Sequence, residues 1–183
     1  LAAAGVHTLL AGRDAARAEE AAARLRADGL PVEAITLVVT DDASIAAAVE
    51  TVTSKYGKLD ILVNNAGIVL DDATKPRSAQ TAQVWRDTFD TNVFGLIAVT
   101  QAFLPLLHKS AAGRIVNVSS ALGSITLHSD PAGPFAGFNL PAYNVSKSAV
   151  NAWTVQLAQE LRDTTIKINT VHPGYVKTDM NKG

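Results

Sequence analysis

The 183-residue chain is 48% hydrophobic and 18% charged, with a formal net charge of -1. This composition is enough for one domain with a substantial core over residues 1–183, and it offers no broad electrostatic attraction for nucleic acid or an anionic membrane. The chain has no cysteine, which excludes disulfides and thiolate metal sites and is compatible with a cytoplasmic location. The four histidines show no metal-ligand spacing and no apolar run approaches bilayer length, so we expect a soluble protein that acts on small molecules.

Strand-like and helical patterns alternate along the chain. A buried strand is predicted at 8–11, followed by a helix at 15–28 that ends at Gly29. The elements that follow are a strand at 35–39, a helix at 42–56, a strand at 59–63, a helical stretch at 81–108, a strand at 114–118, a helix at 142–161 and a strand at 167–171. The Gly/Pro-rich stretch at 121–142 is predicted to be irregular, either a solvated loop or one that contacts substrate.

The order of these elements predicts the fold class. Apolar strands separated by helices are typical of an α/β protein whose parallel sheet is covered on both faces. Three of the strands are followed by polar or glycine-containing segments, namely Asn64 to Gly67, Ser119-Ser120, and Pro173-Gly174. Because the carboxyl ends of parallel strands meet at one edge, we expect these segments to form a ligand site there.

Tyr143 and Lys147 form the most informative pair in the sequence. They are one helical turn apart, so a phenol and an ammonium can point into the same cleft. A nearby cation favours phenolate and is expected to lower the pKa of Tyr143 from its usual value of about 10. A lone Tyr-x-x-x-Lys also arises by chance on exposed helices, and the three strand-end segments favour the chemical interpretation.

Four motifs follow one another along the chain: Asn-Asn-Ala-Gly, Ser, Tyr-x-x-x-Lys and Pro-Gly. With these motifs in this order, nearly the whole chain resembles the short-chain dehydrogenase/reductase family. The resemblance implies a Rossmann-type doubly wound parallel sheet. It also implies that residues 1–183 lack the family's first central strand with its Gly-rich turn, its last strand and its substrate lid. The chain would then be a single partial dinucleotide-binding and catalytic domain.

The resemblance assigns roles to four residues. Tyr143 would exchange a proton with the carbonyl or alcohol oxygen while a nicotinamide exchanges a hydride with the carbon. Ser120, rather than Ser119, would hydrogen-bond that oxygen. Lys147 would lower the Tyr143 pKa and hold the nicotinamide ribose, and Asn92 would support a water-linked proton path to Lys147.

Further segments are assigned to the cofactor by the same resemblance. Asn65, Ala66 and Gly67 would line its adenosine side. Pro173, Gly174, Val176 and Thr178 would lie near the nicotinamide. Arg13, after the first visible strand, favours NADP because a cation at this place suits a 2'-phosphate; NAD is the less favoured alternative that Asp14 keeps open.

Two functional hypotheses follow. The first is an oxidoreductase that transfers a hydride between NADP(H) and a small carbonyl or alcohol substrate. The second is a catalytically inactive remnant or interaction protein without a usable cofactor site. Two features favour this second hypothesis: the absent Gly-rich turn, and Val38 at a position where many members of the family have an aspartate. By resemblance, we also expect a homo-oligomer, a dimer or tetramer, formed through the helices at 91–108 and 141–161.

Overall fold

The computed structural model describes residues 1–176, and its five strands form two parallel sheets. The first sheet pairs β1 (Thr8–Gly12) with β2 (Val32–Thr36). The second has β4 (Arg114–Val118) between β3 (Ile61–Asn64) and β5 (Lys167–Val171). The predicted α/β class with parallel strands is confirmed.

The two sheets are not joined by hydrogen bonds. β1 pairs only with β2, and β3 only with β4, so the described residues contain no strand between the inner edges of β1 and β3. This is where the family resemblance places a central strand. The two sheets nevertheless share a hydrophobic core, in which Leu9 and Ile35 of the first sheet pack against the cluster that Leu62 of β3 also contacts.

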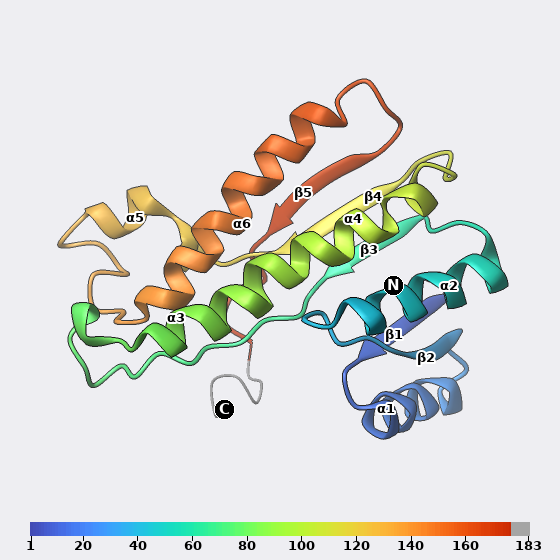
Figure 1. The fold of residues 1–183 in the computed structure, drawn as a ribbon, viewed down its shortest axis with the longest axis horizontal. Helices are drawn as coiled ribbons and strands as arrows, with labels where there is room; N and C mark the ends of the chain where they lie inside the picture. The colour runs from blue at the N-terminus through green and yellow to red at the C-terminus, as the bar shows by residue number, and fades with distance from the viewer. Residues whose placement is uncertain (177–183) are drawn as a thin grey trace.

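Helices cover both faces of the first sheet and, within the described residues, one face of the second. α1 (Ala15–Ala27) packs on β1 and β2, while α2 (Asp42–Tyr56), α4 (Leu96–Leu107) and α6 (Pro141–Glu160) lie side by side over the other face (Figure 1). Asp14 and Asp41 cap the first two helices with side-chain bonds from Arg17 N and Ala43 N. These boundaries match those expected from Asp caps and terminal glycines.

The second strand begins earlier than the sequence predicts. The expected strand at 35–39 is wrong in its bounds, because β2 spans Val32–Thr36 in register with β1. The polar Glu33 lies within the strand and bonds Lys55 and Tyr56 of α2, so the strand's beginning does not show an apolar run. Leu37 and Val39 lie beyond the strand but still pack in the core.

The helical stretch after β3 contains a change of helix type. α3 (Ala82–Phe89) runs into a π-helical segment, Asp90–Gly95, and then into α4. A π turn holds more residues than an α turn, so it rotates the helix that follows it relative to a 3.6-residue pattern. That pattern predicts five core-facing residues, namely Trp85, Phe89, Val93, Ile97 and Phe103. Val93 and Phe103 are buried and the other three only partly so, whereas Leu96 and Val99 are buried as well.

Ala82–Leu107 is also one helical stretch that is long and apolar enough to cross a membrane by length and composition. This corrects the expectation that nothing in the chain approaches bilayer length. Half of its most apolar window is buried inside the fold. Core helices of soluble proteins meet the same criterion, so this stretch is weak evidence for a membrane span.

The predicted irregular stretch before α6 contains two short helices, Ala121–Gly123 and α5 (Ile125–Ser129), and is otherwise turns and loop. Two further 3-10 helices, Ala2–Ala4 and Arg77–Ala79, complete the described elements. The second core cluster lies under α6 and β5 and contains Leu107, Ile115, Leu157, Leu161, Ile166 and Ile168. It fixes α6 against the sheet and so determines where the first turn of α6 lies.

Candidate active site

The start of α6 brings Tyr143 and Lys147 to the carboxyl end of β4. Lys147 is only 4% exposed, and its Nζ donates to the carbonyl of Val118, the last residue of β4, at 2.8 Å. The same nitrogen lies 5.7 Å from the centroid of the Tyr143 ring. The phenol and the ammonium therefore lie close together at the end of β4, as their spacing predicts.

The two serines after β4 have different partners. The side chain of Ser120 hydrogen-bonds that of Tyr143 and accepts from Leu122 N at 3.2 Å. Ser119 is buried, and its Oγ donates to the backbone carbonyl of Lys147 at 3.5 Å. Ser120 is thus the serine beside the phenol, whereas Ser119 serves the local backbone.

Gly123 allows this segment to lie directly on α6. A Cβ at Gly123 would be 2.8 Å from the backbone carbon of Lys147 and 2.9 Å from its Cβ. The Gly123 carbonyl also accepts from Ser148 Oγ at 2.9 Å. Close approach of two backbones requires a residue without a side chain here, and it places Ser120 against the first turn of α6.

The direction of the Tyr143 pKa differs from the expectation. Burial of the phenol raises its pKa above the usual value, and the hydrogen bond with Ser120 opposes that effect only in part. The expected lowering by Lys147 is wrong for this structure, since Lys147 is not among the groups that shift the Tyr143 pKa. Burial also lowers the pKa of Lys147 to about 8, because a low-dielectric site disfavours the charged amine.

Asn92 connects the π-helical segment to both the β3 loop and α6. Its Oδ1 accepts from Ile68 N at 2.8 Å, and its Nδ2 donates to Ile68 O at 2.9 Å and to Ser146 Oγ at 3.0 Å. Ser146 Oγ in turn donates to the Tyr143 carbonyl at 2.7 Å. The side chain of Asn92 therefore reaches α6 through Ser146, and the water-linked path to Lys147 stays a prediction.

The segments expected to bind cofactor follow three parallel strands. Register pairs Asn64 of β3 with Asn117 of β4, and Asn117 with Thr170 of β5, so the strands' carboxyl ends lie at the same edge. After β3, Asn65 and Ala66 are exposed and Gly67 is half-buried. After β5, Pro173, Gly174 and Val176 are exposed, and Thr178 lies outside the described residues.

Comparison with known proteins gives the chain its family. The family model described as short chain dehydrogenase matches residues 1–183. The chain belongs to the short chain dehydrogenase family. It is 36% identical to the short-chain dehydrogenase anuI of Penicillium roqueforti, with 100% of this chain and 74% of that protein covered. This family consists of oxidoreductases, as the residues around Tyr143 indicate.

Two further relatives carry more specific names. The chain is 37% identical to the 3-oxoacyl-acyl-carrier-protein reductase FabG of Thermotoga maritima, with 85% of this chain and 59% of that protein covered. A solved gluconate 5-dehydrogenase from Burkholderia cenocepacia, in complex with NADP and tartrate, superposes with a TM-score of 0.84 at 27% identity. That match covers 99% of this chain and 66% of the solved one. The chain thus spans between 59% and 74% of the length of these relatives.

Two basic side chains at this edge of the sheets have donors left for a polar ligand. An ammonium has three donors, and Val118 O is the one hydrogen-bond acceptor found for Lys147 within residues 1–176. Arg13 is exposed directly after β1 and makes no hydrogen bond or ion pair within the same range. Asp14, the reason for caution about NADP, is engaged as the cap of α1 and lies 3.9 Å from the Arg17 guanidinium. These residues fit a dinucleotide that carries a 2'-phosphate.

Sequence reasoning missed a buried polar network beneath the site. Asn64 Nδ2 donates to Thr100 Oγ1 and to Asn117 Oδ1, both at 2.8 Å. Asn117 Nδ2 continues to Thr154 Oγ1 at 2.8 Å. The network therefore joins α4, β3, β4 and α6. Asparagines inside two otherwise apolar strands were the available signal, because a buried amide requires partners.

Proposed function

We propose that this protein is an NADP-preferring oxidoreductase that interconverts a small carbonyl compound and its alcohol. The observation that carries the proposal is the close grouping of Tyr143, Ser120 and the buried Lys147 at the end of β4. We infer that residues 1–183 act as one dinucleotide-binding and catalytic domain, because one core cluster contacts both sheets. We also place the protein in the cytoplasm, which its lack of cysteine favours.

In this proposal Tyr143 handles the proton. During reduction its O–H donates to the carbonyl oxygen, and during oxidation the phenolate takes the proton from the alcohol. The raised pKa of Tyr143 keeps the phenol protonated at neutral pH, which is the form that reduction requires. When bound, the nicotinamide supplies or accepts the hydride.

Two neighbours assist Tyr143. Ser120 is placed to donate to the same substrate oxygen, as an oxyanion donor would. Lys147 stays positively charged below a pH of about 8, so its ammonium can act as a donor at neutral pH. The unsatisfied donors of its ammonium would bind ribose hydroxyls. Asn92 would carry protons from solvent by way of water.

Residues after β1, β3 and β5 would hold the cofactor. Arg13 would bind the 2'-phosphate of NADP, and Asn65, Ala66 and Gly67 would line its adenosine side. Pro173, Gly174, Val176 and Thr178 would lie beside the nicotinamide. The NADP in the related gluconate 5-dehydrogenase structure supports this preference, and the names of both relatives support a carbonyl or alcohol substrate.

The test is Tyr143→Phe, which removes the transferable proton and keeps the ring. With NADPH and ethyl acetoacetate, a 3-oxo ester, or 5-ketogluconate as the trial substrate, kcat should fall at least about 100-fold. Tyr56→Phe is the matched control, because Tyr56 ends α2 and bonds Glu33 of β2, in the other sheet, and it should keep full activity. Undiminished turnover by a folded Tyr143→Phe protein would remove the proposed role.

A second candidate, an inactive interaction protein, has one observation in its favour. The facing edges of β1 and β3 are unpaired within the described residues, and this is the region that a dinucleotide would cross. Fluorescence titration with NADPH separates the two candidates. Saturable binding that Lys147→Met weakens favours the enzyme, whereas no binding favours the inactive protein.

We further propose that the protein forms homo-oligomers through α4 and α6. A shallow groove between these helices is lined by Gln101, Leu104 and Trp153, and Val155 of α6 is 56% exposed. Apolar side chains on a helix pair suit a self-complementary interface. Sedimentation of the wild-type protein and of Val155→Glu tests this: dimers or tetramers are expected, and the substitution should shift them to monomers.

A further inference from the structure

The first turn of α6 has no cap of its own. A helix leaves its first backbone N–H groups without partners, and a side chain just before the helix usually accepts from them. Here the preceding residue is Leu140, which offers no acceptor, and Pro141 in the first position has no N–H. The amides of Ala142 and Tyr143 therefore need an acceptor from elsewhere in the chain.

Asp71 supplies it from the loop after β3. Its Oδ1 accepts from Ala142 N at 2.7 Å and its Oδ2 from Tyr143 N at 3.0 Å. Asn144 N bonds the Leu140 carbonyl at 2.8 Å, so each backbone N–H in the first turn of α6 has a partner. Hydrogen bonds from amides to a carboxylate are stronger and shorter than neutral ones. One carboxylate thus holds the backbone of the residue that bears the phenol.

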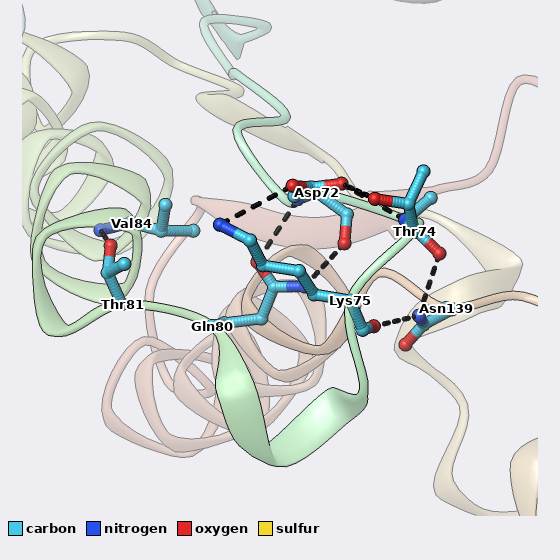
Figure 2. A network of polar contacts seen from close by, with 8 residues as sticks. Asp72, Thr74, Lys75, Gln80, Thr81, Val84 and Asn139 are labelled. Atoms are coloured by element: carbon cyan, nitrogen blue, oxygen red, sulfur yellow. Dashed lines mark hydrogen bonds and ion pairs between the residues drawn. The ribbon is translucent and has the colours of Figure 1, made fainter.

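The loop that carries Asp71 is anchored on both sides. Before it, the backbone of Ile68 is held by both polar groups of the Asn92 amide. After it, the buried Gln80 side chain accepts from Asp72 N at 3.1 Å and donates to Asp72 O at 2.7 Å (Figure 2). Asp71 therefore projects from a fixed backbone.

The same loop is tied to the chain just before α6. The Asp72 carboxylate accepts from Thr74 N and Thr74 Oγ1 at 3.0 and 2.6 Å, which closes a tight turn. Asn139 Nδ2 then donates to the carbonyls of Ala73 and Lys75 at 2.9 and 2.6 Å. Figure 2 shows Asn139 beside Lys75. Asn139 lies two residues before α6, so the hydrogen bonds of Asp71 and Asn139 both tie the start of this helix to the loop after β3.

We propose that Asp71 is a positioning residue for Tyr143: it fixes the catalytic turn of α6 to the strand end that carries Asn65, Ala66 and Gly67. The inference rests on the proposed role of Tyr143. An ordinary cap stabilises its helix and nothing more, whereas this one joins the proton donor to the cofactor-facing edge across 71 residues of sequence. A displacement of about 1 Å at a reacting group lowers turnover by up to about 100-fold.

The test compares Asp71 with an ordinary Asp cap in the same molecule. Asp71→Ala should lower kcat about 100-fold with KM changed less than about twofold, and Asp71→Asn, which keeps one acceptor oxygen, should lower it about tenfold. Asp41→Ala is the matched control, because Asp41 caps α2 by accepting from Ala43 N and lies outside the site. It should lose similar stability and keep its kcat.

A second readout does not depend on turnover. In protein labelled with 13Cζ-tyrosine, Asp71→Ala should move the Tyr143 titration toward the ordinary value for a phenol, because the frayed turn admits water and weakens the burial that raises its pKa. Asp41→Ala should leave that titration in place. If Asp71→Ala does not fold, the kcat and the Tyr143 titration of Asp71→Asn test the proposal in its place.

The outcomes separate the two proposals. If Tyr143→Phe abolishes turnover but Asp71→Asn and Asp71→Ala retain wild-type kcat and Tyr143 titration, the positioning role is overturned and the proposed function stands. Equal losses of kcat in Asp71→Ala and Asp41→Ala would also overturn it, since they would reflect stability alone. If Tyr143→Phe is fully active, the proposed function itself fails.

Discussion

The two sheets of this protein differ in how they use polar side chains. Every buried polar residue in the described part of the chain lies at or beyond Asn64, in the half built on β3, β4 and β5. In the half built on β1 and β2, α1 buries only two alanines, and its charged side chains are exposed. The first half therefore offers exposed, exchangeable charges, whereas the second holds its polar groups in fixed positions.

This difference indicates which half of the molecule carries each part of the proposed function. Fixed, desolvated groups can position a proton donor and change its pKa, as burial does for Tyr143 and Lys147. Exposed groups such as Arg13 interact through solvent and can only bias the choice of ligand. Substitutions in the second half should therefore change turnover or stability, whereas those in the first half should change ligand preference and leave stability nearly unchanged.

The largest effect is expected from Lys147→Met, which should separate activity from stability. Turnover should fall at least about 100-fold because the positive charge is lost. At neutral pH the ammonium is charged in a site that lowers its pKa from about 10.4 to about 8. That burial costs the folded protein about 3 kcal/mol, so the variant should be more stable even after losing the bond to Val118.

The stability cost of burying the Lys147 ammonium depends on pH. Between about pH 8 and 10.4 the unfolded protein binds the Lys147 proton and the folded protein does not, so wild-type stability from this group rises with pH. The advantage of Lys147→Met in urea unfolding should therefore be large at pH 7 and small at pH 10. The exposed Lys109→Met serves as control and should show no such trend. A Lys147→Met protein that is less stable than wild type at pH 7 would contradict the account.

The next effect in size concerns the buried network. Asn117→Leu removes the amide that links Asn64 to Thr154 and leaves a buried donor without its partner. We expect a loss of about 3 kcal/mol in the free energy of unfolding, measured in urea. The same change at Asn169, an exposed position on the neighbouring β5, should stay within about 0.5 kcal/mol. Equal effects at both positions would show that the network adds no stability.

The smallest effect on the fold is expected in the first half. Arg13→Glu should weaken NADPH binding about 10- to 100-fold, because a charge-assisted bond to the 2'-phosphate is replaced by repulsion. Binding of NADH should weaken less, and stability should change by no more than about 0.5 kcal/mol. Arg86→Glu, an exposed substitution with the same change in net charge, controls for charge alone. Unchanged NADPH affinity in Arg13→Glu would place the 2'-phosphate elsewhere.

Much of the fold follows from local sequence patterns. The strands Arg114–Val118 and Lys167–Val171 were predicted with the observed bounds, because a short apolar run with polar flanks fixes both ends. The meeting of Ser120, Tyr143 and Lys147 follows from parallel strands ending at one edge. The second strand was misplaced because Glu33 interrupts its apolar pattern while bonding α2.

The parts that could not be predicted depend on distant contacts. Asp71 lies 71 residues before the amide of Ala142, and Asn64 lies 53 residues before Asn117, so no local pattern reveals either pairing. The direction of the Tyr143 pKa also depends on burial, which spacing does not give. A helical spacing of four shows that Lys147 is near Tyr143, but it does not show that the ammonium donates to Val118.

The measurement that tests the central claim most directly is an NMR titration of the Tyr143 phenol. The chain has three tyrosines, so 13Cζ-tyrosine labelling gives three signals, which single Tyr→Phe substitutions assign. We predict that Tyr143 titrates above the ordinary value of about 10, and that Ser120→Ala, which removes the opposing hydrogen bond, raises its pKa further. A Tyr143 that titrates at the ordinary value and does not respond to Ser120→Ala would contradict the account of a buried proton donor held by Ser120.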